Sequence, residues 1–156
     1  MYRLPAALSE PRKPLRAIFI GWLLAFVPSL LLAAAAQWLL PDAGRPSFEV
    51  GGLETIALLV IFAPLVETLV MAAVLELLLR LMPPAAAIIA SAIGWGIAHS
   101  LAAPAWGLVI WWPFMIFSTL YVTWSKRSVL AALAIVFAVH ALQNLGPSLL
   151  LLSETG

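Results

Sequence analysis

The stretch LETIALLVIFAPLVETLVMAAVLELLLRL, residues 53–81, decides the class of fold. A helix that crosses the hydrocarbon core of a bilayer needs roughly 20 mostly apolar residues, and this stretch exceeds that length. It is also too long and too continuous in its apolar character to be hidden inside a water-soluble domain of this size. The stretch therefore predicts a transmembrane helix.

The composition of the whole chain agrees with this prediction. Of its 156 residues, 64% are apolar and 10% are charged, which is not the composition of a soluble domain. The net charge of +1 argues against a nucleic-acid partner, because nucleic acids bind to strongly basic surfaces. Because the chain has no cysteine, disulfides, thiolate metal ligands and a cysteine nucleophile are excluded.

Five apolar runs of membrane-spanning length follow one another, separated by proline, glycine or basic residues. They are residues 15–40, 53–81, 84–103, 105–124 and 129–152. We therefore predict an all-α, multi-pass helical membrane bundle of about five transmembrane helices, forming a single domain over residues 1–156. The first run is about twice as long as the apolar part of a signal peptide, so we predict a retained helix.

Proline and glycine inside the runs predict local changes in the helices. Kinks are expected at three prolines, which are Pro28, Pro64 and Pro113. Gly146 and Pro147 predict a break in the last helix. Gly94 and Gly96 predict that a neighbouring helix approaches closely.

The basic residues predict the orientation, because short loops rich in Lys and Arg stay in the cytoplasm. An N-terminus in the cytoplasm places nearly all basic residues on that side. The cytoplasmic ones are then Arg3, Arg12, Lys13, Arg16, Arg80, Lys126 and Arg127, and the outer one is Arg45. So compact a chain is typical of bacteria, and we predict the bacterial inner membrane as its location.

Ionisable side chains at membrane depth are costly, and they indicate functional sites unless a local partner explains them. Glu76 has such a partner, because Arg80 follows it by one helical turn and an ion pair is expected. Glu67 precedes Glu76 by a spacing that puts it on the opposite helix face. Glu67 therefore needs a partner from another helix.

The candidate partners of Glu67 lie on two other helices. Counted from the cytoplasmic helix ends at ~1.5 Å per residue, Glu67 and His99 lie ~21 Å deep, His140 ~18 Å and Asn144 ~24 Å. Three helices thus bring four polar side chains into one layer, which predicts a joint functional site. A lone intramembrane His or Asn is often only an interhelical hydrogen bond, and we interpret Gln143 in that way.

A carboxylate, two imidazoles and a carboxamide can together hydrolyse an amide bond. Glu67 is the candidate general base for water, and His99 is a candidate for sharing or relaying the proton. His140 and Asn144 are candidate hydrogen-bond donors to the oxyanion, a contribution that is largest where water is excluded.

Three short stretches carry these residues on separate helices: APLVET (63–68), WGIAH (95–99) and HALQN (140–144). They resemble the motifs Glu-Glu-x-x-x-Arg, Phe-x-x-x-His and His-x-x-x-Asn of the CAAX-protease and bacteriocin-processing (CPBP, or Abi) family of glutamate-type intramembrane endopeptidases. The resemblance covers about residues 55–150, and the helix of residues 15–40 precedes this core.

The resemblance implies an endopeptidase that cleaves membrane-associated peptides or protein precursors. Its catalytic residues would be Glu67, His99, His140 and Asn144. The chain departs from the family pattern at two positions, because Thr68 replaces the second Glu and Ala72 stands in the place of the Arg. If the second Glu and the Arg of the family form a buried ion pair, losing both avoids an unpaired charge and is less damaging than losing one.

The resemblance also implies a metal-free glutamate mechanism, so no cofactor is predicted. Zinc is the alternative, because Glu67, His99 and His140 could formally supply three ligands and leave one position open. Activity that a chelator removes and zinc restores would decide for the metal.

Three functions of other classes stay open. The first is a non-catalytic membrane binding protein, such as an immunity factor that holds a peptide, and a Glu67→Gln variant would distinguish it from a protease. The second is a b-type haem carrier with His99 and His140 as axial ligands, which a Soret band would reveal. The third is a proton or ion pathway through Glu67, although no polar residues continue such a path to either surface.

Overall fold

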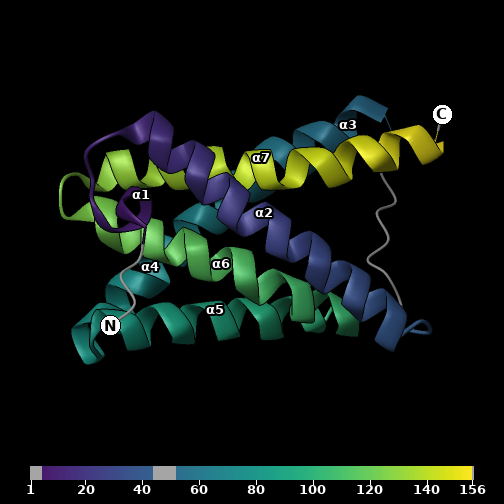
Figure 1. The fold of residues 1–156 in the computed structure, drawn as a ribbon, viewed down its shortest axis with the longest axis horizontal. Coiled ribbons are helices and arrows are strands. Elements are labelled where there is room, and N and C mark those ends of the chain that lie inside the picture. Colours follow the sequence, from purple (N-terminus) through teal and green to yellow (C-terminus); the bar gives the residue numbers. More distant parts are fainter. Residues whose placement is uncertain (1–4, 44–51, 156) are drawn as a thin grey trace.

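The computed structural model describes residues 5–43 and 52–155, the last three of them by their backbone alone. Helices and turns account for these residues (Figure 1). The helical elements are α1 (Ala6–Ser9), α2 (Pro14–Leu39), α3 (Gly52–Ile56), η1 (Ala57–Phe62), α4 (Ala63–Leu81), α5 (Pro84–Ser100), α6 (Pro104–Ser125) and α7 (Val129–Thr155). The element η1 is a π-helix, and α3, η1 and α4 together form one continuous helical stretch.

Four helical stretches of the described residues are long and apolar enough to cross a membrane. They are Pro14–Leu39, Gly52–Leu81, Pro104–Ser125 and Val129–Leu152. The predicted all-α, multi-pass membrane bundle is thereby confirmed.

The predicted run 84–103 is shorter as a helix than as a stretch of apolar sequence. Its helix, α5, has 17 residues, which corresponds to roughly 26 Å. Leu101 and Ala102 form a turn after Ser100. Ala103 is extended, and the next helix begins at Pro104. In the described part of the chain, four helices instead of about five therefore have full spanning length.

Proline determines where several helices begin. The helices α2, α5 and α6 each start with a proline, since the first residue of a helix needs no N–H donor and the fixed φ angle of proline suits this position. The turns between α4 and α5 and between α6 and α7 are short, so these helices are antiparallel neighbours.

The central helix of the bundle is α6. It packs against α2, α5 and α7, and Figure 1 shows it running between α5 and α7. Five large side chains on it are at most 2% exposed, namely Phe114, Phe117, Leu120, Tyr121 and Trp124. The core of the protein is therefore built around the second half of α6.

A pair of glycines brings α5 and α6 close together. A Cβ atom on Gly107 would collide with the carbonyl of Gly96 and the hydroxyl of Ser100. The predicted close approach is thus correct for Gly96. It is wrong for Gly94, where an added Cβ would have nothing within 4 Å.

The helix α7 continues through Gly146 and Pro147, so the predicted break is wrong. A proline removes one backbone hydrogen bond, but leaving the helix inside a bilayer would expose further backbone groups at a larger cost. The hydroxyl of Ser148 also donates to the carbonyl of Asn144 at 2.8 Å. The helical conformation is therefore retained.

The two ends of the bundle carry different charges. One end holds α1, the turn between α4 and α5, and the turn between α6 and α7 (Figure 1). The basic residues of these segments are Arg12, Lys13, Arg16, Arg80, Lys126 and Arg127. The acidic residues Asp42 and Glu54 lie at the other end, next to the end of α2 and in α3. Arg3 and Arg45, also used to predict the orientation, lie outside the described residues.

Candidate active site

Glu67 on α4 and His140 on α7 face each other inside the bundle. The distance between Glu67 Oε2 and His140 Nε2 is 3.6 Å, and the side chains are 26% and 5% exposed, respectively. Because a carboxylate inside a membrane needs a compensating partner, this contact answers the question that the sequence raised about Glu67. The structure therefore brings two of the four predicted site residues into direct contact.

Aromatic rings hold the imidazole of His140. The ring of Phe117 lies 4.7 Å from it and the ring of Phe114 lies 5.4 Å from it, measured between centroids. Nδ1 of His140 is buried and has no hydrogen-bond partner among the described residues. A buried polar atom of this kind is unusual in a purely structural position.

His99 on α5 reaches this pair through an aromatic ring. Its centroid lies 5.7 Å from that of Phe114, which also contacts His140. Its Nδ1 lies 2.9 Å from the carbonyl oxygen of Trp95, and because a carbonyl only accepts, Nδ1 carries the proton and Nε2 is the acceptor in the neutral ring. Trp106 packs edge-on against the same ring at 4.7 Å.

Asn144, one turn after His140 on α7, donates from Nδ2 to the carbonyl of Leu59 at 2.9 Å. The register of η1 explains why this carbonyl accepts. The N–H of Ala63 bonds to the carbonyl of Leu58, so the same spacing pairs Leu59 with residue 64. That residue is Pro64, which has no N–H to donate. Asn144 therefore supplies the hydrogen bond that Pro64 cannot.

A cavity of about 670 Å³ lies next to these residues. It is bounded by the second half of α2, the start of α6 and the end of α7, where Figure 1 shows α2 and α7 diverging. Its lining includes Asn144, Leu59 and Trp106. The cavity therefore reaches the neighbours of both histidines.

Gln143 belongs to this cavity, which differs from its interpretation as a simple interhelical hydrogen bond. It is 9% exposed, lines the cavity, and its Oε1 has no hydrogen-bond partner among the described residues. Sequence reasoning also missed Phe114 and the carbonyl of Leu59. An apolar ring and a backbone oxygen carry no chemical signal in a sequence, although the spacing of Pro64 hints at the carbonyl.

Glu76 has a different partner from the one predicted. Its Oε1 accepts a hydrogen bond from the hydroxyl of Tyr121 on α6 at 2.9 Å. No ion pair between Glu76 and Arg80 occurs within the described residues; the donor comes from a neighbouring helix instead. Glu76 still lies apart from the Glu67 site.

The two positions that depart from the family motif are both buried. Thr68 is 2% exposed and Ala72 is 6% exposed, and they lie one turn apart on α4. Met71 and Leu75 are fully buried on the same helix, so uncharged side chains fill the positions where the family motif has Glu and Arg.

The three candidate zinc ligands do not fit a metal site. Nowhere in the described ranges are three His, Cys, Asp or Glu side chains grouped closely enough to hold a metal ion. His99 is directed to Trp95 and Trp106 and is joined to His140 through Phe114. A haem bound by both histidines would likewise need the space that the Phe114 ring occupies.

The chain matches no protein-family model, no curated protein and no solved structure. The resemblance to the CAAX-protease and bacteriocin-processing family therefore rests on the three motifs, and it stays a prediction.

Proposed function

We propose that this chain is a glutamate-type intramembrane endopeptidase that hydrolyses a peptide bond in a membrane-associated peptide or protein precursor. The observation that supports this proposal best is the buried contact between Glu67 and His140, next to a cavity of about 670 Å³ that Asn144 lines. The proposal includes the bacterial inner membrane as the location.

In the proposed reaction, Glu67 takes a proton from a water molecule as the oxygen of that water attacks the scissile carbonyl carbon. The carbonyl oxygen becomes an oxyanion. Nε2–H of His140 and the second amide hydrogen of Asn144, which the bond to Leu59 leaves available, are the donors that stabilise it. The proton on Glu67 then passes to the leaving amine, and the carbonyl forms again as the peptide bond breaks.

His99 has a supporting place in this scheme. Its contacts are with Trp95, Trp106 and Phe114, so it positions Phe114 against His140 from the α5 side. This differs from the proton relay that the sequence suggested, and it makes His99 a positioning residue.

Glu67→Gln is the decisive variant, because it preserves shape and removes the base. We expect cells that express the wild-type chain to accumulate cleaved membrane-associated peptides, detectable by mass spectrometry of new N-termini. Those fragments should disappear with Glu67→Gln, and the variant should co-purify with the uncleaved precursor.

Glu76→Gln is the matched control. It makes the same chemical change on the same helix, at a carboxylate that bonds to Tyr121 instead of His140. Fragments should persist with this control. Fragments that persist equally with Glu67→Gln would refute the protease.

A non-catalytic peptide-binding or immunity protein is the second candidate. The observation that favours it is the bond between Asn144 and Leu59, which gives Asn144 a structural purpose. In that case, Glu67→Gln would leave both peptide capture and the cellular phenotype unchanged.

A further inference from the structure

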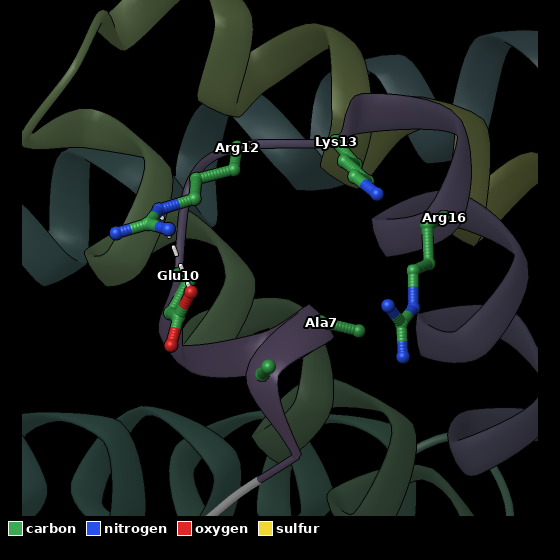
Figure 2. Close-up of a pocket in the computed structure, with 6 residues that line it drawn as sticks. Ala7, Glu10, Arg12, Lys13 and Arg16 are labelled. Atoms are coloured by element: carbon green, nitrogen blue, oxygen red, sulfur yellow. Dashed lines mark ion pairs between the residues drawn. The ribbon is translucent and has the colours of Figure 1, made fainter.

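A second cavity lies at the basic end of the bundle, well apart from Glu67. It has a volume of about 230 Å³ and lies between α1 and the start of α2. Its lining residues are Ala6, Ala7, Glu10, Arg12, Lys13 and Arg16. Figure 2 shows Lys13 and Arg16 directed into the space beside Ala7, while Arg12 turns toward Glu10.

The walls of this cavity are held in place by contacts with the core. Leu8 of α1 is only 2% exposed, and its carbonyl accepts a hydrogen bond from the hydroxyl of Thr123 on α6 at 2.7 Å. The guanidinium of Arg127 donates to the carbonyl of Pro11 at 3.1 Å. The segment from α1 to α2 is thus a fixed strap across the end of α6, and the cavity is a built feature.

The charges that line the cavity favour an anion. Arg12 and Glu10 form an ion pair at 3.5 Å between Nε and Oε2, which leaves the positive charges of Lys13 and Arg16 without a carboxylate among the lining residues. Both residues lie at the start of α2, where no side chain caps the helix. The first backbone N–H groups of a long helix add to the attraction for a negative group.

The surroundings of the cavity are those of a membrane surface. Leu15 and Phe19, which follow the cavity residues on α2, are 81% and 55% exposed. These side chains belong to the membrane-spanning helix Pro14–Leu39. An anionic group in the cavity would therefore lie where a membrane-spanning helix begins, which is the level of the phospholipid headgroups.

We propose that this cavity binds the phosphate group of an anionic phospholipid, with Lys13 and Arg16 as the principal ligands. The shared chemistry is a phosphate oxyanion, and the position of the cavity at the start of a membrane-spanning helix favours a lipid over free phosphate as its source. The site lies at the basic end of the bundle and does not depend on the proposed protease activity.

The test uses the full chain in detergent and native mass spectrometry. The probes are dioleoyl phosphatidylglycerol, dioleoyl phosphatidylcholine and inorganic phosphate, each added separately. We expect the wild type to retain phosphatidylglycerol in preference to phosphatidylcholine. The double variant Lys13→Gln/Arg16→Gln should bind phosphatidylglycerol roughly tenfold more weakly.

The matched control is Arg80→Gln/Lys126→Gln, which removes two charges from the same end of the bundle outside the cavity. It should retain phosphatidylglycerol as the wild type does. An equal loss in both double variants would overturn the proposal, because it would show a general effect of surface charge. Inorganic phosphate that binds as tightly as the lipid would overturn the lipid as the ligand.

A gain-of-binding variant guards against misfolding. Glu10→Gln removes the carboxylate from the lining and releases Arg12, so it should strengthen the retention of phosphatidylglycerol several-fold. Unchanged or weaker binding by Glu10→Gln would contradict the assignment of the cavity.

Discussion

Asn144 donates one amide hydrogen to the carbonyl of Leu59, which Pro64 leaves without a backbone donor. We expect Asn144→Leu to lower the free energy of unfolding by about 1 kcal/mol, because it leaves this carbonyl unpaired. Pro64→Ala supplies a backbone N–H, so the same change should cost clearly less in that background. Unfolding in mixed micelles measures both values.

This double-mutant cycle also tests the explanation of the π-helix. If Asn144→Leu costs the same in the wild type and in the Pro64→Ala variant, Pro64 does not create the need for Asn144, and the interpretation of the register is wrong.

The two histidines differ in their expected contribution to cleavage. His140→Phe should abolish cleavage, because it removes the nitrogen that faces Glu67. His99→Phe keeps an aromatic ring against Trp106 and Phe114, so it should retain part of the rate. Both variants are compared with the wild type by the yield of the peptide fragments.

The same substitution at both positions makes this comparison a matched one. Complete loss with His99→Phe, in a protein whose thermal stability is unchanged, would restore His99 as a direct participant in proton transfer.

The depth of the polar residues could be derived from the sequence, but their pairing could not. The rise per residue gives the depth along a helix axis, so the common layer of Glu67 and His140 was predictable. Which side chains meet also depends on how each helix is rotated and tilted. The sequence therefore left open which residues contact Glu67, and the structure selects His140 and places Phe114 next to His99.

At the scale of the elements, the contact between α5 and α6 depends on Gly107. Gly107→Ala should destabilise the protein by about 1–3 kcal/mol, because its Cβ has no room beside the backbone of Gly96. Gly94→Ala is the control on α5, since its Cβ would meet nothing within 4 Å. Thermal unfolding in detergent should show a lower midpoint for Gly107→Ala alone.

A drop of equal size for both variants would mean that general packing, not this contact, controls stability, because helix propensity alone favours alanine over glycine. If the midpoint of thermal unfolding does not drop for Gly107→Ala, α5 and α6 can move apart at little cost to make room for the Cβ atom.

The lengths of the helices were only partly predictable. Apolar composition gives the extent of a hydrophobic run, but α5 ends at Ser100 because the chain must turn before Pro104. The course of α7 through Pro147 was missed for the opposite reason. A lipid environment makes leaving a helix more costly than keeping a proline inside it.

At the scale of the whole molecule, the orientation can be tested because the chain has no cysteine. Single cysteines at Asp42 and Ser128 lie at opposite ends of the bundle, and both positions are exposed. An impermeant maleimide should label Asp42→Cys in spheroplasts, whereas Ser128→Cys should be labelled only after the membrane is opened. The reverse pattern would invert the predicted topology.

Composition was enough to predict that the molecule is a membrane protein. The strap that α1 forms across the end of α6 could not be predicted. Leu8 and Ala7 are buried, but four helical residues followed by a charged stretch give no periodic pattern to interpret. The strap is a tertiary feature, fixed by contacts with Thr123 and Arg127.

In two places, a side chain on a late helix donates a hydrogen bond to a carbonyl on an earlier helix that a proline leaves without its backbone donor. The indole of Trp112 donates to the carbonyl of Leu24 at 2.7 Å, the carbonyl that Pro28 leaves without a donor four residues later. The amide of Asn144 donates to the carbonyl of Leu59, which Pro64 leaves without a donor.

During synthesis, α2 and the stretch α3–α4 therefore enter the bilayer with an unpaired carbonyl each, long before their donors exist. Each unpaired group is costly in lipid, so the early helices have a reason to stay near the insertion site until α6 and α7 arrive. We expect the order of synthesis to be part of how this bundle assembles.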